Sequence, residues 1–153
     1  MQHSNGYTGF TLVELMMVIT IAGILLGMGI PAFGNYKANQ QTFSTAESLV
    51  SALNFARSEA IKRRSTATIA PLTPNWSDGW TVATNGITLS NYGAAEGVTI
   101  SASSPTAPIY NRDGRLSAAA DISFSITVNS HSSASRCVKI TLSGKPTTDS
   151  GGC

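Results

Sequence analysis

Charge, histidine and cysteine are scarce in this chain. Lys, Arg, Asp and Glu make up 12% of its 153 residues, and there are two histidines and two cysteines. This set does not suffice for a zinc site, and no glycine-rich phosphate loop separates a strand from a helix. A Ser-His-Asp set around His131 would lie in a Ser-rich connection that we expect to be mobile. The sequence therefore predicts no enzyme, no metal and no cofactor.

The net charge of the chain says little about its binding partners. Ten Lys and Arg stand against eight Asp and Glu, for a net charge of +2. This excess is too small to imply a nucleic-acid partner by itself. Once the apolar N-terminal region is set aside, about 120 residues remain, which suffices for one domain with its own core but not for two.

Charge is almost absent from the N-terminal region. Residues 10–30 contain no Lys, Arg, Asp or His, and Glu14 is their one charged residue. As a helix, this stretch would be roughly 30 Å long, enough to cross the hydrocarbon core of a bilayer. The sequence predicts a short leader over residues 1–9 and the transmembrane half of a helix over residues 10–30.

The position of Gly9 sets this region apart from a secretory signal, in which the cleavage site follows the apolar core. The core is preceded here by Gly9-Phe10-Thr11-Leu12-Val13-Glu14-Leu15, which resembles the prepilin signature of type IV pilins and type II secretion pseudopilins. The resemblance implies that a prepilin peptidase cuts between Gly9 and Phe10 and methylates Phe10. The leader lacks the Lys or Arg that such leaders usually carry.

Glu14 has two interpretations. A carboxylate inside a bilayer costs a few kcal/mol and usually has a partner. The resemblance implies that Glu14 pairs with the N-terminal amine of a neighbouring subunit during filament assembly. The alternative is an acidic residue at the headgroup level, favoured by the positive end of the helix dipole.

An amphipathic half of the helix is expected over residues 31–64. Pro31 follows three glycines, so the helix should kink or loosen there, or end and be followed by a second helix. Beyond it, apolar residues recur at spacings of three and four. They are Phe43, Ala46, Leu49, Val50, Leu53, Ala56, Ala60 and Ile61. Glu59 and Arg63 are spaced for an ion pair, and the basic residues 62–64 suit the helix C-terminus.

The apolar period falls to two beyond residue 65. Short strands are expected around residues 67–69, 80–82, 98–102, 122–128 and 138–142, with Asn85-Gly86 as a hairpin turn. We expect loops over residues 85–97 and 129–135, and we expect Trp76 and Trp80 in turns and core. The predicted fold class is α+β, with the long helix packed against an antiparallel β-sheet or small β-sandwich over residues 65–153.

The two cysteines, Cys137 and Cys153, lie near the C-terminus. A pair of cysteines in a membrane-tethered, non-cytosolic domain predicts a disulfide. Two free thiols are the alternative, which a cytosolic location would favour.

Three further segments resemble the GspH/FimT family of minor pilins and pseudopilins: Leu53–Arg63, Asp78-Gly79-Trp80 and Ile109–Arg115. The resemblance implies a minor type IV pilin with a structural, priming or tip role. Such a protein sits in the inner membrane with its domain in the periplasm. It then joins other pilins in a pilus or pseudopilus, at or near the cell surface. The alternative is an H-type minor pseudopilin of a type II secretion system.

A DNA-binding minor pilin for natural transformation is a further alternative. Some members of the resembled family bind DNA through a C-terminal Gly-Arg-X-Arg motif, where this chain has Gly144-Lys145-Pro146-Thr147. Lys is a point charge without the guanidinium fork, and Thr removes a charge, so phosphate neutralisation would be weaker. The candidate residues are Arg112, Arg115, Arg136, Lys139 and Lys145, and scattered solvated charges are the competing explanation.

Overall fold

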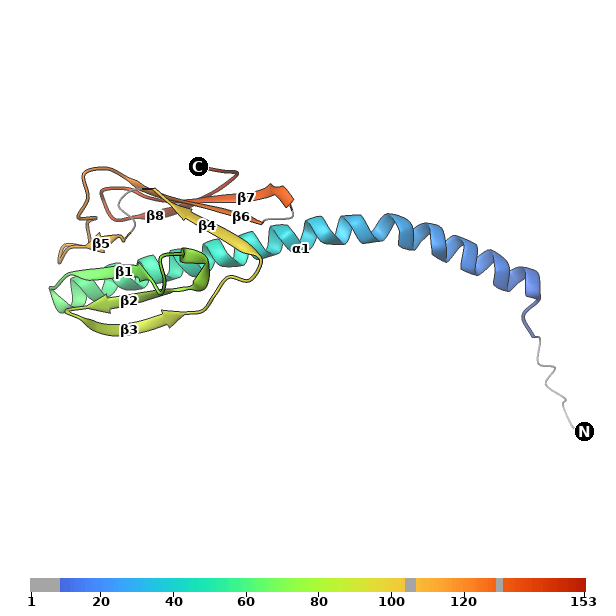
Figure 1. Ribbon diagram of the computed structural model, residues 1–153, viewed down its shortest axis with the longest axis horizontal. Helices are drawn as coiled ribbons and strands as arrows, with labels where there is room; N and C mark the ends of the chain where they lie inside the picture. Colours follow the sequence, from blue (N-terminus) through green and yellow to red (C-terminus); the bar gives the residue numbers. More distant parts are fainter. Residues whose placement is uncertain (1–8, 104–106, 129–130) are drawn as a thin grey trace, which may run out of the picture. The chain divides into compact units, whose positions relative to one another are not determined.

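The computed structural model describes residues 9–103, 107–128 and 131–153, and their side chains except those of residues 28–32 and 131–133. Within these residues the chain forms one long helix, a short 3-10 helix and eight strands (Figure 1). It divides into two compact units, the first ending at Tyr36 and the second running Lys37–Cys153. The helix, α1 (Leu12–Arg63), begins in the first unit and ends in the second.

The part of α1 in the second unit buries one face, as the apolar stripe predicts. The buried residues are Ala38, Thr42, Thr45, Ala46, Leu49, Ala52, Leu53, Ala56, Glu59 and Ala60. Phe43 and Ile61, which the sequence assigned to this stripe, are 43% and 48% exposed. Each lies about 100° round the helix from a buried neighbour, Thr42 or Ala60, and therefore points away from the core.

α1 ends through a left-handed residue. Arg64 has a φ of 51°, and the backbone N–H groups of Arg64 and Ser65 donate to carbonyls of the last turn at 3.2 and 3.1 Å. These bonds satisfy carbonyls that a helix end leaves free. Glu59 accepts a hydrogen bond from Arg63 Nε at 2.6 Å and lies 3.7 Å from Lys62 Nζ, which confirms the predicted ion pair.

The first sheet has the order β3-β2-β1-β5, with antiparallel neighbours. Its strands are β1 (Ala67–Pro71), β2 (Trp80–Thr84), β3 (Ile87–Tyr92) and β5 (Ile109–Tyr110). Asn85 and Gly86 both have positive φ, as a type I′ turn requires, so the predicted hairpin is confirmed. The loop expected over residues 85–97 is wrong for Ile87–Tyr92. This edge strand is only partly buried and lacks the clear apolar alternation of the other strands.

The second sheet has the order β4-β6-β7-β8 and is also antiparallel. Its strands are β4 (Val98–Ala102), β6 (Ile122–Val128), β7 (His131–Ile140) and β8 (Pro146–Ser150). The loop expected over residues 129–135 is wrong from residue 131 onward, and residues 129–130 lie outside the described residues. There the backbone ladder with β6 forms the strand, although the side chains are mostly serine.

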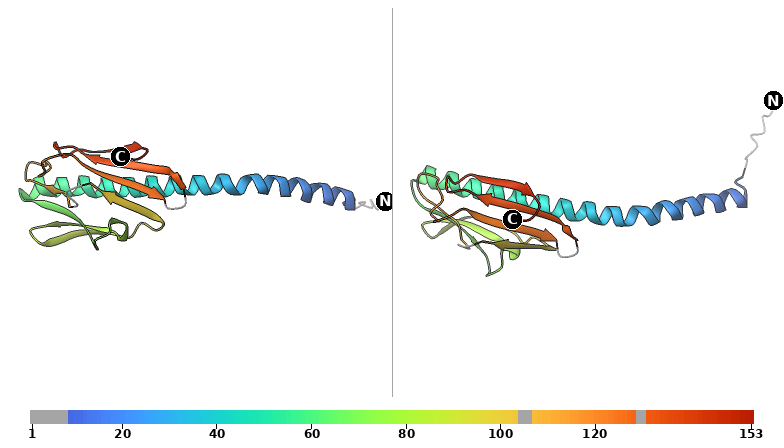
Figure 2. Two further views of the ribbon diagram at one scale, coloured as in Figure 1. Left: turned by 45° about the horizontal axis from the view of Figure 1, so that its top comes forward. Right: turned by 90° about the horizontal axis from the view of Figure 1, so that it is seen from above.

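Helix and sheets share one hydrophobic core within the second unit (Figure 2). Trp76, in η1 (Trp76–Asp78), packs edge-on against Phe124 of β6 with ring centroids 4.9 Å apart. Trp80 of β2 stacks on Tyr92 of β3 at 5.8 Å. Both tryptophans are at most 3% exposed, so their predicted place in turn and core is confirmed. The predicted α+β class, with the helix packed on antiparallel sheets, is confirmed as well.

Candidate functional site

Gly9 and Phe10 of the N-terminal motif lie outside the helix, whose first turn is capped by a side chain. Gly9 and Phe10 precede α1 and are exposed, Phe10 at 83%. The backbone N–H of Glu14 donates to Thr11 Oγ1 at 3.3 Å, so Thr11 caps the first turn. The Gly9–Phe10 bond therefore lies outside the helix, in a chain segment that a peptidase can reach. Its cleavage and the methylation of Phe10 stay predictions.

The Glu14 carboxylate has no hydrogen bond or ion pair with any residue that the structure describes. Its side chain is exposed in the first turn of α1, where the positive end of the helix dipole favours an acid. The dipole and a filament partner both stay open as the reason for an acid at this position.

Apolar side chains surround the helix of the first unit. They are Leu12, Val13, Leu15, Met16, Met17, Val18, Ile19, Ile21, Ile24, Leu25 and Leu26, each between 56% and 74% exposed. These positions leave the helix no broad polar face for water. Exposed apolar surface of this extent marks a site of contact with lipid or protein.

α1 runs unbroken from Leu12 to Arg63 and so continues through Pro31, which excludes the expected alternative of a helix end followed by a second helix. The Pro31 side chain lies outside the described side chains, so the predicted kink stays a prediction. Among the described residues, no helix combines the length and the hydropathy that a membrane crossing requires.

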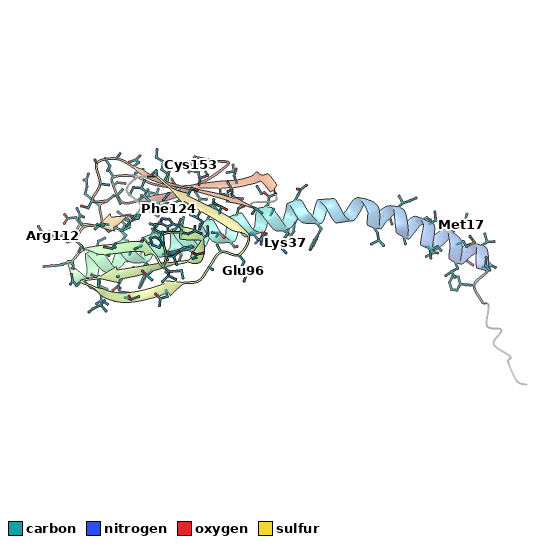
Figure 3. All side chains as sticks on the ribbon, viewed as in Figure 1. Met17, Lys37, Glu96, Arg112, Phe124 and Cys153 are labelled. Atoms are coloured by element: carbon teal, nitrogen blue, oxygen red, sulfur yellow. A yellow bond between two sulfur atoms is a disulfide. The ribbon has the colours of Figure 1, made fainter. Side chains whose placement is uncertain are left out.

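Cys137 and Cys153 form a disulfide, with their Cα atoms 5.0 Å apart, which confirms the predicted pairing. Cys137 lies on β7, and Cys153 follows β8, the strand that pairs with β7. The ladder and the covalent bond therefore both hold the C-terminal segment on the second sheet. Figure 3 labels Cys153 beside this sheet.

Three of the five candidate DNA-binding residues come together at one end of the second unit. Arg112 and Arg115 belong to the turn that contains Gly114, and Lys145 follows Gly144 in another turn. The two turns touch, because a Cβ atom on Gly144 would collide with the Gly114 carbonyl oxygen. The Asn111 side chain closes the first turn, since its Oδ1 accepts from the backbone N–H groups of residues 113 and 115 at 3.0 Å each.

The other two candidates already have partners. Lys139 Nζ lies 3.3 Å from Asp121 Oδ2. The Arg136 guanidinium lies over the Phe43 ring, 5.0 Å from its centroid. The five predicted residues therefore do not act as one set of free cations, and only Arg112, Arg115 and Lys145 share the two touching turns.

Sequence reasoning missed the part that α1 plays at this end. Arg57 Nε donates to the Gly114 carbonyl at 3.0 Å. Arg64, which the sequence analysis placed at the helix C-terminus but not among the DNA-binding candidates, lines a hollow of about 360 Å³ together with Ser65, Thr66, Asn111 and Arg112. The two-residue pairing of β5 with β1 brings these segments side by side. No local pattern in the sequence signals so short a strand.

The Tyr110 ring packs against the Gly144 turn. Its side chain is fully buried, and its hydroxyl has no hydrogen-bond partner among the described residues. Burial raises the pKa of Tyr110 to about 12, while the Arg57 charge acts in the opposite direction. The ring therefore stays neutral at physiological pH, and its role is to pack beneath the turns.

Two family models match the chain. The prokaryotic N-terminal methylation motif matches residues 4–30. The model described as type II transport protein GspH matches residues 45–144, well over half of the chain. The chain belongs to the GspH family. The resemblance to the GspH/FimT family drawn from Leu53–Arg63 and the two β-domain motifs is thereby confirmed.

Several pilins share shorter stretches with this GspH-family protein. A fimbrial protein of Pseudomonas aeruginosa is 49% identical over 53 residues, which are 35% of this chain and 34% of that protein. A fimbrial protein of Moraxella nonliquefaciens is 41% identical over 56 residues, 35% and 36% of the two chains. The chain thus matches about a third of the length of these relatives.

Solved structures of minor pilins and pseudopilins have the same fold. The crystal structure of the type IV minor pilin FimU of Pseudomonas aeruginosa has a TM-score of 0.66 at 22% identity, covering 72% of this chain and 89% of that one. The minor pseudopilin EpsH from the type 2 secretion system of Vibrio cholerae has a TM-score of 0.55 at 12% identity, covering 72% and 97%. At these identities the likeness shows the fold alone.

Proposed function

We propose that this GspH-family protein is a minor type IV pilin with a structural, priming or tip role in a pilus. The observation that carries this proposal is the order of two matched segments in one chain. An N-terminal methylation motif over residues 4–30 precedes a GspH domain over residues 45–144. A chain built in this order keeps its apolar helix once the leader has been removed, and the helix then serves as the filament-forming segment.

The apolar helix first anchors the protein in the inner membrane by a single pass over residues 10–30, with the second unit in the periplasm. Exposed apolar side chains all round the first unit support this placement, since water solvates them poorly. The Cys137–Cys153 disulfide supports an oxidising compartment for the second unit. From the membrane the protein passes into the filament, where other pilins replace lipid around the helix.

Processing creates the charge that Glu14 needs. Prepilin peptidase cuts after Gly9, and the new, methylated amine of Phe10 is a cation. In an apolar surrounding, an unpaired carboxylate is costly, whereas one paired with such an amine is favoured. Glu14 of the incoming subunit therefore recognises the amine of a neighbouring pilin and selects the correct axial position. Its lack of any partner among the described residues supports this role.

Replacing Glu14 tests the assembly role. We expect Glu14→Gln to leave cleavage and methylation intact, as intact-mass spectrometry of the purified protein reports, but to remove the protein from sheared filaments. Glu47→Gln is the matched control, because Glu47 is an exposed acid on the second-unit part of α1. Normal incorporation of the Glu14→Gln protein would contradict the proposed pairing.

The type of filament is a separate question. An H-type pseudopilin would follow the same steps, and the EpsH likeness supports its fold only. Expressing the processed protein in cells that hold either a pilus machinery or a type II secretion system distinguishes the two. Incorporation that requires the pilus machinery supports the proposal, and incorporation that requires the secretion system contradicts it.

A further inference from the structure

Positive charge gathers where α1 ends. The segments at this end, which we call the basic end, carry seven of the ten Lys and Arg residues: Arg57, Lys62, Arg63, Arg64, Arg112, Arg115 and Lys145. The acids at this end are Glu59, Asp113 and Asp121, and the Asp121 carboxylate accepts a hydrogen bond from the Leu142 backbone N–H at 3.0 Å and pairs with Lys139. Figure 3 labels Arg112 at this end of the second unit. So large an excess of one sign creates a field that attracts anionic partners.

The fold uses some of these cations and leaves others free. Lys62 and Arg63 pair with Glu59, and Arg57 donates to the Gly114 carbonyl. The guanidinium groups of Arg64 and Arg112 have no hydrogen bond or ion pair with any described residue. Two strong bidentate donors are therefore available at the same place.

These two arginines line one hollow of about 360 Å³, together with Ser65, Thr66 and Asn111. No acid lines it. Because Asn111 Oδ1 is occupied by its own turn, its amide nitrogen is the part of the side chain left to donate. The hollow thus presents N–H and O–H donors and two positive charges, which is the chemistry that holds an oxyanion.

Aliphatic side chains also come to the surface at this end. Ile61, Ile109 and Leu142 are 48%, 38% and 39% exposed. Ile61 lies against Gly114, and the Leu142 carbonyl accepts the backbone N–H of Leu116 beside the same turn. A mixture of arginine and exposed aliphatic surface is typical of a protein interface, whereas a nucleic-acid backbone has little apolar surface to cover.

We propose that the basic end docks an acidic segment of a partner protein. One Asp or Glu carboxylate enters the hollow between Arg64 and Arg112, and apolar neighbours in the partner pack on Ile61, Ile109 and Leu142. The site lies wholly within the second unit, so it does not depend on the proposed filament role of the N-terminal helix. Opposite charge speeds the encounter, and the carboxylate–guanidinium hydrogen bonds fix its orientation.

Peptide binding to the full-length protein in detergent micelles tests the proposal. The probe is a fluorescent peptide that alternates Glu or Asp with Leu or Ile, and its match replaces every acid by Gln or Asn. Fluorescence anisotropy should show binding of the acidic peptide, weakening as salt rises, and no binding of the neutral one. Failure of the acidic peptide to bind at low salt would overturn the proposal.

Charge-removing variants locate the site. Arg64→Gln/Arg112→Gln should weaken peptide binding ~10-fold or more, the loss expected for two charge-assisted contacts. The matched pair of single changes is Arg64→Gln and Lys37→Gln, which remove the same charge, and Lys37 is exposed and lies outside the hollow. Lys37→Gln should change the affinity less than ~2-fold. Equal losses from Arg64→Gln and Lys37→Gln would mean unspecific charge attraction and would contradict the proposal.

Variants of the exposed aliphatic residues distinguish a protein partner from a nucleic acid. Ile109→Ser/Leu142→Ser should weaken peptide binding several-fold, because the partner's aliphatic side chains lose their contacts. A short DNA duplex is the comparison probe. If the duplex binds more tightly than the peptide and keeps its affinity in this variant, the basic end is a nucleic-acid site and the proposal is wrong. Circular dichroism of each variant verifies that the second unit is folded.

Discussion

One helix carries two kinds of apolar surface. In the first unit, Leu25 and its apolar neighbours are more than half exposed. In the second unit, Leu49 and Leu53 of the same helix are fully buried. The residue types are alike, and the difference lies in what the rest of the chain supplies. The second unit builds its own core from two sheets, whereas the first unit offers an apolar surface whose cover comes from lipid or from other subunits.

Glycines show the same contrast. In the first unit, a Cβ atom on Gly23 or Gly27 would meet nothing within 4 Å. In the second unit, Gly144 has a φ of 82°, and a Cβ there would collide with the Gly114 carbonyl oxygen. Among the glycines that the structure describes, close packing of backbone on backbone thus occurs only in the unit that has its own core. The following substitutions test this contrast.

The largest expected effect is that of Gly144→Ala. Strain at positive φ and collision with a backbone oxygen should together lower the free energy of unfolding by about 4 kcal/mol or more. Urea unfolding of the full-length protein in micelles, followed by tryptophan fluorescence, measures it. Gly86→Ala has a similar φ of 77° in open space and should lose only about 1 kcal/mol. Gly23→Ala, in the first unit, should not lower the midpoint of urea unfolding.

Leu53→Ala should cause the second-largest loss of unfolding free energy. Leu53 is fully buried between helix and sheets, so removing its side chain should cost roughly 2–5 kcal/mol in the same experiment. Leu25→Ala removes the same atoms from an exposed position in the first unit and should change unfolding by less than about 0.5 kcal/mol. A loss from Leu25→Ala as large as that from Leu53→Ala would break the contrast between the units.

Local patterns in the sequence predicted those elements whose burial follows a simple period. Buried alanines and leucines at helical spacing marked the second-unit part of α1, and strict alternation marked β6. The sequence patterns did not predict the edge strands β3 and β8. Their side chains are largely exposed, and the strands are held by backbone hydrogen bonds to one neighbouring strand. An element that buries little leaves little trace in its own sequence.

The candidate sites divide in the same way. The N-terminal motif is contiguous, so Gly9, Phe10 and Glu14 could be named from the sequence. The hollow at the basic end joins Arg64 to Arg112 through the short pairing of β1 with β5. Chain segments far apart in sequence meet there, and neither segment has a spacing that would predict the other.

The disulfide ranks next in expected effect. Cys137 and Cys153 are 16 residues apart, and releasing a loop of this length from the unfolded chain should cost about 3 kcal/mol. Cys137→Ala/Cys153→Ala should therefore unfold at lower urea. The first unit contains no cysteine, so its helix should be unaffected in far-ultraviolet circular dichroism. An unchanged midpoint would mean that the ladder of β8 on β7 holds this segment without the bond.

The two units also treat an acid differently, and this gives the smallest expected effect. The Glu14 carboxylate has no partner among the described residues, whereas Glu59 lies between Lys62 and Arg63. The hydrogen bond from Arg63 holds the pKa of Glu59 below its ordinary value of 4.5, the Lys62 and Arg63 charges act in the same direction, and burial acts against them. The folded state therefore favours the carboxylate.

Because the folded-state pKa is lowered, Glu59 should stabilise the fold at neutral pH, and this contribution should be lost as the pH falls through the lowered value. The difference in urea midpoint between wild type and Glu59→Gln should accordingly be small but measurable at neutral pH and should vanish in acid. Glu14→Gln, the matched change in the first unit, should show no difference at either pH. If the difference in urea midpoint between wild type and Glu59→Gln instead grew as the pH fell, its pH dependence would have the opposite sign. The ion pair would then be excluded as its cause.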